Sequence, residues 1–377
     1  MDTNRAAWLS HKHAFLDVKE APLVAPTAHQ IVIKNGAVAV NPVEWCKQLM
    51  GNLMFSWIKY PFILGNDCAG EVVQVGDAVS RFKIGDRVLA HALGMDPTVN
   101  NSAEGAFQRF TVIRDNMASV IPEWLSYEEA CVLPLGLSTA ASALFQKDFL
   151  ALDKPDIDNL GTLTAPPRPR EVVLVWGGST SVGSNAIQLA KAAGYEVIAT
   201  SSTKNFEYIH NLGANEAFNY ASETAVPDII EAIDTKTVAG AIAIGNGSTE
   251  ACIEILSRTN GSKFVAQASF PFPEKVPGTS FGVFRAMAAV VWSNITIFFK
   301  SKLRGVKTKF IFGSSLANNE VGAMIYRDFL PRALEERKYV PAPKAIVSGH
   351  GLAQIQAAML RHMQGVSASK IVVSIRH

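Results

Sequence analysis

The sequence predicts an α/β protein in which a β-rich part is followed by a doubly wound parallel sheet. The first observation behind this prediction is residues 171–200, where a buried apolar run, a glycine-rich turn, a helix with an apolar stripe and a second strand follow one another. The second is the alternation of apolar strands and helices from there to about residue 305. Because parallel strands need a crossover between them, this alternation predicts a parallel sheet with helices on both faces.

The first 145 residues are β-rich and irregular. Residues 65–88 contain short strand-like runs separated by Gly-Asp pairs, which are typical of turns. We expect the acidic residues beside these glycines, Asp67 and Glu71, to bond the backbone rather than to act as acid or base. Ser126, followed three residues later by Glu129, predicts the cap of a helix.

We expect three segments along the chain, 1–140, 141–309 and 310–377, with the last returning to pack on the first. The proline-rich stretch 150–170 is expected to be a surface loop. Residues 286–299 carry no charged residue, but polar residues interrupt them and they are too short to span a bilayer. A buried segment, an oligomer strand or the wall of a substrate tunnel is expected there.

Length and composition indicate a well-packed enzyme of two domains, with 377 residues, 48% of them hydrophobic and 18% charged. The net charge of +2 provides no general field, so we expect neither nucleic acid nor a membrane as a partner. The N-terminus lacks the apolar core of a signal peptide. A reducing, cytoplasmic setting is predicted because no C-x-x-C pair occurs among the four cysteines, Cys46, Cys68, Cys131 and Cys252.

The turn at 177–183 reads GGSTSVG and departs from the standard G-x-G-x-x-G pattern. A tight turn that leads into a helix presents backbone N–H groups and a helix N-terminus to an anion. The alternative is that any tight strand-to-helix turn needs glycines and hydroxyl caps. The turn alone leaves both interpretations open.

Residues 199–206 read ATSSTKNF, in the region where an NAD site carries an acidic residue for the ribose hydroxyls. Hydroxyl and amide groups can donate hydrogen bonds to a phosphate, and Lys204 supplies positive charge. The sequence therefore favours NADP(H) over NAD(H). The alternative for Lys204 is a solvated lysine at the start of a helix.

Several motifs in order resemble the medium-chain dehydrogenase/reductase superfamily over nearly the whole chain. Asn41–Trp45 resembles its N-P-x-D-W segment, Gly65–Gly76 its G-x-E-x-x-G turn and following strand, and Leu133–Leu144 its L-P-L-x-x-x-T-A-x-x-A-L helix. The resemblance implies a GroES-like catalytic domain and a Rossmann nucleotide-binding domain. The nucleotide turn and the later SSTKN and FNY resemble the zinc-independent, NADP-dependent branch, with its quinone reductases and fungal trans-acting enoyl reductases that serve polyketide synthases in secondary metabolism.

The resemblance also implies where NADPH contacts the chain. It assigns the pyrophosphate to one turn, the 2′-phosphate to the ends of two strands, and the nicotinamide to residues from both domains. In chain order these residues are Val43, Glu44, Trp45 and Cys46 near the nicotinamide, Ser179, Thr180, Ser181 and Val182 at the pyrophosphate, Ser202, Thr203, Lys204, Asn205 and Tyr220 at the 2′-phosphate, and Gly245, Ser369 and Lys370 at the nicotinamide end.

No metal is predicted. Zinc-dependent members carry a G-H-E motif, whereas Asn66-Asp67 follows Gly65 in this chain, and the four-cysteine structural lobe is missing. Cys46 lies near the position of a zinc-binding cysteine, but a catalytic zinc needs three protein ligands. Enoyl reductases of the polyketide type often have lysine directly after the tryptophan, where this chain has Cys46 and then Lys47.

Our main hypothesis is an NADPH-dependent reductase of an activated double bond or a quinone. Transfer of hydride to the β-carbon places negative charge on the carbonyl oxygen, which then needs a hydrogen-bond donor. The resemblance places Thr139 at a helix start facing the cleft, as donor or as a helix cap. Lys47 is a second candidate, as electrostatic stabiliser or proton donor, and protonation by water stays open.

Two other hypotheses stay open, a non-catalytic NADP-binding sensor or scaffold and a carbonyl or alcohol oxidoreductase. The latter is disfavoured because nothing replaces zinc as a Lewis acid for a simple carbonyl. The expected substrate is a small enone, enoyl compound or quinone, either free or bound to a carrier on a polyketide synthase. The enzyme is expected to be a monomer or a homodimer.

Overall fold

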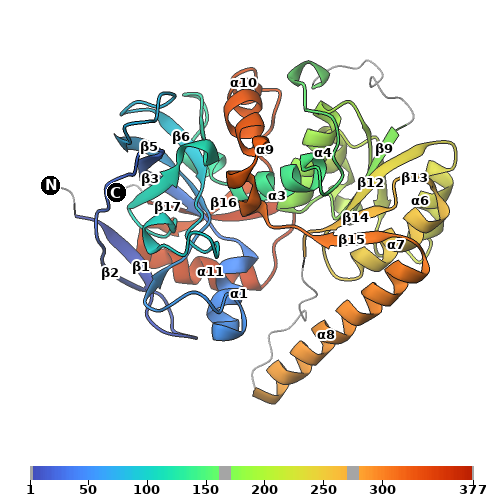
Figure 1. The fold of residues 1–377 in the computed structure, drawn as a ribbon, viewed down its shortest axis with the longest axis horizontal. Helices are drawn as coiled ribbons and strands as arrows, with labels where there is room; N and C mark the ends of the chain where they lie inside the picture. The colour runs from blue at the N-terminus through green and yellow to red at the C-terminus, as the bar shows by residue number, and fades with distance from the viewer. Residues whose placement is uncertain (1–2, 161–170, 270–279, 376–377) are drawn as a thin grey trace. The chain divides into compact units, whose positions relative to one another are not determined.

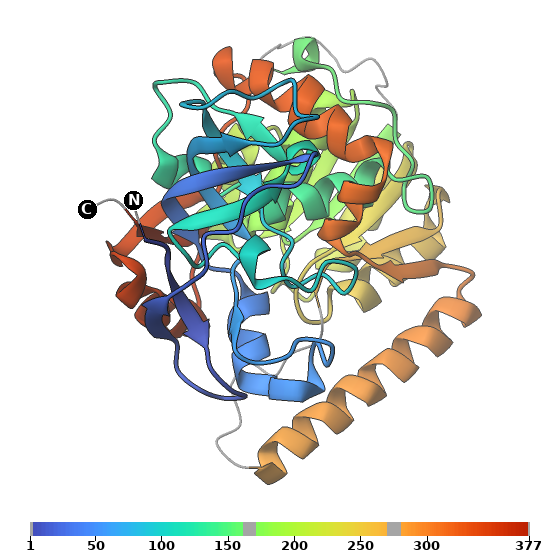
Figure 2. The ribbon, with the colours of Figure 1, turned by 60° about the vertical axis from the view of Figure 1, so that its left-hand side comes forward.

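The computed structural model describes residues 3–160, 171–269 and 280–375, without the side chains of 280–284, 286 and 287 (Figures 1 and 2). The chain divides into two compact units, one made of 1–138 and 314–377 and the other of 139–313. The predicted loop 150–170 is irregular up to residue 160, apart from a short 3₁₀ turn, and its remainder lies outside the described residues.

The first unit contains two sheets. The smaller has the strand order β2 (Asp17–Glu20), β1 (Arg5–Leu9), β4 (Phe62–Ile63). The larger has the order β16 (Lys344–His350), β17 (Ser369–Ser374), β3 (Gln30–Ala39), β5 (Asp67–Val75), β6 (Arg87–His91), β8 (Ala118–Val120), and β7 (Phe110–Arg114) also pairs with β3.

The two ends of the chain meet in this larger sheet. Strand β17 pairs antiparallel with β3, with Val372 opposite Ala39, although more than three hundred residues separate the two in sequence. The core of the unit is formed by alternate apolar residues of β3, β5 and β6, together with residues of the C-terminal helix α11 (Ile355–Met363).

The remaining helices of the first unit are short. They are α1 (Pro42–Met50), α2 (Tyr127–Ala130), α9 (Glu320–Ala323) and α10 (Leu330–Glu335). At α2 the predicted cap is confirmed, because Ser126 Oγ accepts a hydrogen bond from Glu129 N at 3.2 Å and Glu129 Oε2 accepts one from Ser126 N at 3.2 Å.

The second unit contains the predicted doubly wound sheet, which is confirmed. Its strand order is β11 (Glu216–Asn219), β10 (Glu196–Ser201), β9 (Glu171–Trp176), β12 (Thr237–Ala243), β14 (Phe264–Gln267), β15 (Lys307–Phe310), all parallel, with β13 (Asn260–Gly261) beside β12. The chain runs outward from β9 to β11 and then returns to β12. The strand order therefore reverses between β9 and β12, where such sheets bind their ligands.

Helices connect these strands. They are α4 (Ser181–Ala192), α5 (Phe206–Asn211), α6 (Ala225–Ile233), α7 (Ser248–Arg258) and α8 (Ser280–Leu303), preceded by α3 (Pro134–Phe145), which enters the unit from the first. Apolar residues of α6 and α7 pack on the sheet face that carries Val172 and Leu174. Because side chains alternate along a strand, Val173 and Val175 point to the opposite face.

Of the three alternatives expected for residues 286–299, the buried segment and the oligomer strand are wrong. These residues belong to α8, and two of their large apolar side chains, Val291 and Trp292, are 57% and 71% exposed. Apolar residues occur around much of this helix, so the sequence pattern did not indicate which side is buried. In the part of the chain that the structure describes, no helix is long and apolar enough to cross a membrane.

Candidate functional site

The glycine turn after β9 lies where the strand order reverses. A Cβ added to Gly177, which has a φ of +92°, would lie 2.8 Å from the carbonyl oxygen of Ile244, directly after β12. A Cβ on Gly183 would lie 2.2 Å from the carbonyl oxygen of Gly177, so only glycine allows α4 to start this close to the turn. Both glycines thus let the turn, the end of β12 and the start of α4 pack closely against one another.

Hydrogen bonds fix the shape of this turn. The hydroxyl of Thr180 caps α4 by accepting from Gly183 N at 3.0 Å and donates to the carbonyl oxygen of Gly177 at 2.8 Å. Thr200 Oγ1, at the end of β10, accepts from Gly177 N at 3.0 Å. The Thr180 hydroxyl therefore makes its hydrogen bonds within the turn. The partly exposed Ser179, Ser181 and Val182 surround the helix N-terminus, whose partial positive charge favours an anion.

The predicted 2′-phosphate residues gather at the ends of β10 and β11. Asn205 Nδ2 donates to Ser202 Oγ at 3.1 Å across a 3₁₀ turn that places Thr203 and Lys204 in solvent. Tyr220 directly follows β11, its N–H bonds the carbonyl oxygen of Ser201 at 3.4 Å, and its side chain is 52% exposed. The two neighbouring parallel strands thus bring hydroxyl, amide and ammonium groups to one edge of the sheet.

Gly245 follows β12 and has a φ of +100°, which favours glycine. A Cβ at this position would meet nothing within 4 Å, so the space beside the loop is open. Its N–H donates to Ser269 Oγ at 3.1 Å and its carbonyl oxygen accepts from Ser248 Oγ at 2.6 Å. These bonds hold the loop in place next to Ile244, which neighbours the glycine turn.

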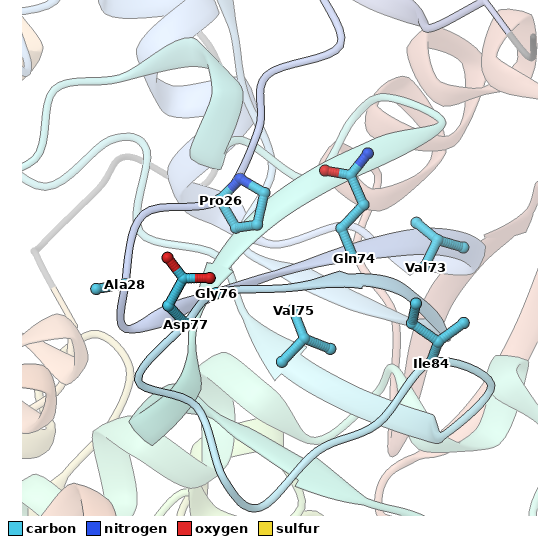
Figure 3. Close-up of a pocket in the computed structure, with 8 residues that line it drawn as sticks. All are labelled: Pro26, Ala28, Val73, Gln74, Val75, Gly76, Asp77 and Ile84. Carbon is cyan, nitrogen blue, oxygen red and sulfur yellow. The ribbon is translucent and has the colours of Figure 1, made fainter.

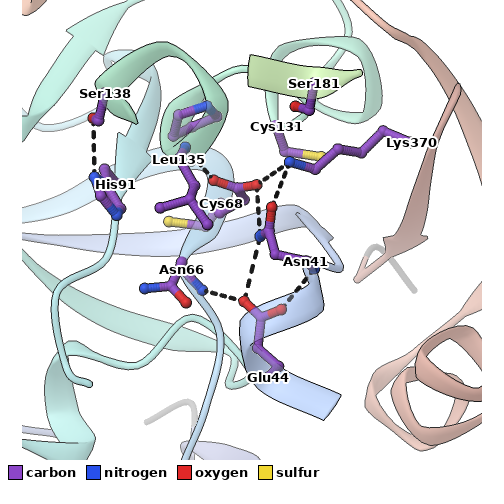
Figure 4. Close-up of polar contacts among 12 residues, drawn as sticks. Asn41, Glu44, Asn66, Cys68, His91, Cys131, Leu135, Ser138, Ser181 and Lys370 are labelled. Atoms are coloured by element: carbon purple, nitrogen blue, oxygen red, sulfur yellow. Dashed lines mark hydrogen bonds and ion pairs between the residues drawn. The ribbon is translucent and has the colours of Figure 1, made fainter. Parts of the chain in front are cut away.

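In the first unit, two of the predicted residues, Glu44 and Lys370, belong to a buried polar cluster around Asp67. Figure 4 labels Glu44 and Lys370 together with Asn41 and Asn66. One carboxylate oxygen of Asp67 lies 2.7 Å from Lys370 Nζ and accepts from Asn41 Nδ2 at 2.9 Å. The other accepts from the backbone N–H of Leu135, at the start of α3, at 2.6 Å. The bond to Leu135 confirms the expected backbone role, whereas the ion pair with Lys370 was not predicted.

Lys370 was expected at the nicotinamide end. Its side chain is 3% exposed, and its ammonium also donates to Asn41 Oδ1 at 2.7 Å. The ammonium therefore serves the cluster around Asp67. Ser369, at the start of β17, bonds the carbonyl oxygen of Ser367 at 3.1 Å through its hydroxyl.

Glu44 is fully buried and caps α1. Its carboxylate accepts from Asn41 N at 2.6 Å and from Asn66 N at 3.1 Å. Burial raises the pKa of Glu44 to about 8, and the nearby negative charge of Asp67 acts in the same direction. This arrangement does not favour the predicted contact with a cofactor, because the side chain is enclosed and already bonded.

The neighbours of Glu44 on α1 differ in exposure. Cys46 is buried, and burial raises the pKa of its thiol. Val43 and Trp45 are partly exposed, and Trp45 Nε1 donates to His362 Nδ1 at 3.0 Å. Among the predicted residues of α1, Val43 and Trp45 are therefore the ones that can present surface to a ligand.

The expectation that Lys47 acts as a proton donor is not supported. The side chain is 0% exposed, and Nζ donates to the carbonyl oxygens of Gly51, Met54 and Phe55 at 2.9, 3.0 and 3.1 Å. An ammonium has three protons, so all of them are used to hold the chain that follows α1. We assign Lys47 a structural role and do not retain it as a catalytic residue.

Thr139 lies inside α3, which starts at Pro134, so it is not a helix cap as one alternative proposed. Its side chain is 8% exposed. A Cβ added to Gly313 would lie 2.8 Å from Thr139 Oγ1, which shows that the backbone at Gly313 packs against this hydroxyl. Glycine at 313 thus leaves room beside the hydroxyl of Thr139.

The sequence did not predict a chain of hydrogen bonds directly before Thr139. His91 Nδ1 lies 3.0 Å from Ser138 Oγ, which lies 2.7 Å from Tyr326 Oη, and this hydroxyl donates to the carbonyl oxygen of Pro134 at 3.0 Å. Burial lowers the pKa of His91 to about 4, so the imidazole is neutral at pH 7. No local signal could have indicated this chain, because its members come from separate parts of the sequence.

The side chains near the position that a catalytic zinc would occupy form ion pairs or hydrogen bonds with other protein groups. Asp67 pairs with Lys370, and Asn66 Nδ2 donates to the carbonyl oxygen of Ala92 at 3.2 Å. Among the described residues, no group of three His, Cys, Asp or Glu side chains could hold a metal ion.

A shallow cavity of about 380 Å³ on the first unit contains none of the predicted site residues. It is lined by Pro26, Ala28, Val73, Gln74, Val75, Gly76, Asp77 and Ile84 (Figure 3).

Comparison with known proteins defines the class. Residues 27–123 match the alcohol dehydrogenase GroES-like domain, and residues 181–276 match the zinc-binding dehydrogenase family. The chain belongs to the medium-chain dehydrogenase/reductase superfamily, a family of oxidoreductases, and the predicted GroES-like and Rossmann folds are confirmed.

Individual relatives match along the whole chain. The dehydrogenase pigH of Monascus ruber is 52% identical, covering 100% of both chains. The trans-enoyl reductase himH of Aspergillus japonicus is 33% identical, covering 99% of this chain and 97% of that protein. The quinone oxidoreductase structure from Coxiella burnetii matches with a TM-score of 0.65 at 22% identity, covering 100% of both chains, and shares the fold. These relatives imply a nicotinamide cofactor and small-molecule substrates.

Proposed function

We propose that the protein is an NADPH-dependent, zinc-independent reductase of an activated carbon–carbon double bond, in an enone or enoyl compound, or of a quinone. The observation that carries the cofactor is the cluster of Ser202, Lys204 and Tyr220 at the ends of two adjacent strands, beside the glycine turn. The trans-enoyl reductase himH and the quinone oxidoreductase among the similar proteins support the choice of acceptor.

The residues present fit a dinucleotide. Gly177 and Gly183 let the turn pack against Ile244 and the start of α4, where a Cβ would clash with backbone oxygens, and the space beside Gly245 is open. The N-terminus of α4, with Ser179, Ser181 and Val182 around it, would hold the pyrophosphate. Ser202, Thr203, Lys204, Asn205 and Tyr220 would hold the 2′-phosphate through charge-assisted hydrogen bonds. The bound dinucleotide supplies a hydride equivalent.

In the second unit, the nicotinamide end would lie beside Gly245. In the first unit, Val43 and Trp45 of α1 and the backbone at Ser369 are the candidates to contact it. Glu44, Cys46 and the Lys370 ammonium would support the contacting residues without touching the ligand. All three are buried, and Glu44 and Lys370 are hydrogen-bonded within the protein. Thr180 contributes by shaping the turn.

Thr139 would donate its hydroxyl proton in a hydrogen bond to the carbonyl oxygen of the acceptor. Reduction at the β-carbon moves negative charge onto that oxygen, and one well-placed donor contributes about 2.7–4 kcal/mol to stabilising it. Because the Lys47 ammonium is enclosed by three carbonyl oxygens, the proton for the α-carbon comes from water. An isolated carbonyl would need a stronger electrophile than a threonine hydroxyl.

In this proposal the chain provides no set of ligands for a catalytic zinc. Asp67 is neutralised by Lys370, Asn66 replaces the usual histidine position, and burial disfavours the thiolate of Cys46 that a metal requires. We further propose a cytoplasmic enzyme, monomeric or homodimeric, that acts on a free substrate or on one bound to a polyketide synthase carrier.

The test is oxidation of NADPH by purified protein with a panel of enones, enoyl thioesters, quinones and isolated aldehydes. We expect turnover with at least one activated acceptor and none with the aldehydes, before and after treatment with a chelator. Turnover of aldehydes alone, or activity that is lost with the chelator and restored by zinc, contradicts the proposal. Tight NADPH binding without oxidation by any acceptor would instead identify a non-catalytic sensor or scaffold.

A further inference from the structure

Helix α8 carries a stripe of large apolar side chains that faces solvent. Its six members are each between 43% and 85% exposed, and we call this set the α8 stripe: Val291, Trp292, Ile295, Phe298, Phe299 and Leu303. Their spacings of three, four and seven residues place them on one side of the helix. An apolar surface of this kind on a soluble protein marks an interaction site.

The opposite side of α8 is attached to its own unit. Ile297 and Ser301 are each only 7% exposed, and Ile297 belongs to the core formed by α6, α7 and the sheet. At 100° per residue, Ile297 lies about 200° from both Ile295 and Phe299. Packing of the unit therefore holds α8 in place with the α8 stripe turned away from this core. Figures 1 and 2 show α8 as one long helix.

The charged residues within α8 are all basic, and Arg304, directly after the helix, pairs with Glu254 of α7 at 3.3 Å. No Asp or Glu occurs between Glu274 and Glu320, whereas this segment contains several lysines and arginines. Lys302, four residues after Phe298, lies within the stripe, and Arg285, seven residues before Trp292, lies at its edge. Both are exposed, and they are joined by the exposed Lys300 and Lys307.

We propose that the α8 stripe docks on an anionic membrane surface. Aromatic and leucine side chains on one side of a helix, with lysine and arginine beside them, are the features of helices that lie in the plane of a lipid interface. Anionic headgroups would pair with the basic residues, while the long lysine side chains reach past the apolar side chains to the headgroups.

A second copy of the chain fits this surface less well. A symmetric pair of α8 helices would place basic residues on both partners with no carboxylate from residues 275–319 to meet them. From Arg285 to Leu303 the helix is about 27 Å long, and an exposed amphipathic helix of this length can lie along a planar, deformable surface. Its exposed apolar side chains and its basic charge lead us to a lipid surface rather than a protein as the partner.

The experiment is sedimentation of the full-length protein with vesicles of phosphatidylcholine, with and without phosphatidylserine. Two double variants remove the two features separately, Trp292→Ser with Phe299→Ser and Lys300→Glu with Lys302→Glu. The matched control is Lys83→Glu with Ile84→Ser, an exposed basic and apolar pair on the first unit. Unchanged NADPH affinity and thermal midpoint show that each variant is folded.

We expect binding to the phosphatidylserine vesicles that weakens with added salt and falls at least about tenfold in both α8 variants, but not in the control. Absence of binding to these vesicles, or equal binding by the wild type and the α8 variants, overturns the proposal. It is also overturned if the α8 variants instead dissolve a dimer seen by light scattering, or abolish binding to an acidic carrier domain while the wild type ignores vesicles.

Discussion

Asp67 is the residue on which most of the buried polar contacts in the first unit depend. It receives the Lys370 ammonium from β17, the Asn41 amide from the start of α1 and the Leu135 N–H from α3. A buried carboxylate is stable only when paired and hydrogen-bonded, and these three contacts provide that. The cost of burying charge is instead visible next to it, where the pKa of Glu44 is raised to about 8.

Glu44 makes the stability of the fold depend on pH. Because its pKa is higher in the folded than in the unfolded chain, the folded state binds an extra proton, and this contribution to stability is lost as pH rises through about 8. We expect Glu44→Gln to flatten the fall in the free energy of unfolding between about pH 5 and pH 8, measured by urea titration. Glu71→Gln, at an exposed position of β5 in the same unit, is the control that should leave the slope unchanged. An identical slope in the wild type and Glu44→Gln contradicts this prediction.

Lys204 determines cofactor choice in the proposal. Removing a charge-assisted contact to the 2′-phosphate costs roughly 1.5–3 kcal/mol, so Lys204→Ala should weaken NADPH binding by more than tenfold. NADH lacks this phosphate, and its affinity should not change. Fluorescence titration with both cofactors measures this, with Lys154→Ala, another exposed lysine of the second unit, as the matched control. Undiminished NADPH affinity in Lys204→Ala would remove the basis for NADP preference.

Helix α3 links the buried hydrogen bonds that hold its first turn to Thr139, the proposed hydrogen-bond donor. Its first turn is held by Asp67 at Leu135 N and by Tyr326 at the carbonyl oxygen of Pro134, and Ser138 bonds both Tyr326 and His91. These contacts fix the helix one residue before Thr139. The position of the Thr139 hydroxyl is thus set by side chains far apart in sequence.

Thr139→Val should lower kcat on the order of a hundredfold and leave NADPH affinity intact, since one donor to the developing oxyanion is lost. Gly313→Ala should lower kcat as well, because its Cβ would lie 2.8 Å from Thr139 Oγ1 and displace it. Ser142→Ala removes a hydroxyl one turn further along the same helix and serves as the control. Steady-state kinetics with saturating NADPH decide the matter. An unchanged kcat in Thr139→Val would show that its hydroxyl has only a structural role.

At the scale of elements, the sequence predicts those structural features that are determined by residues close together in the chain. The strand–turn–helix unit at 171–200 and the Ser126–Glu129 cap could be predicted because apolar period and capping residues are local signals. The pairing of β17 with β3 and the ion pair of Asp67 with Lys370 could not, because they depend on how distant segments pack. Lys47 was misjudged for the same reason, since only the fold shows the carbonyl oxygens around its ammonium.

Over the whole molecule, average properties conceal local ones. The net charge of +2 predicts no electrostatic partner, yet the segment between Glu274 and Glu320 has no acidic residue and contains the exposed α8 stripe. The proposed membrane contact therefore departs from the expectation drawn from composition. The segment boundaries 1–140, 141–309 and 310–377 and the oligomeric state stay predictions.

The central claim is that the protein reduces an activated double bond with NADPH. The most direct test uses NADPH deuterated at C4 of the nicotinamide, an enone or enoyl thioester selected from the panel, and mass and NMR analysis of the product. We predict deuterium at the β-carbon, because a hydroxyl such as that of Thr139 can stabilise the enolate oxygen but is a weak electrophile for an isolated carbonyl. Deuterium on a carbinol carbon would show instead that the protein is a carbonyl reductase.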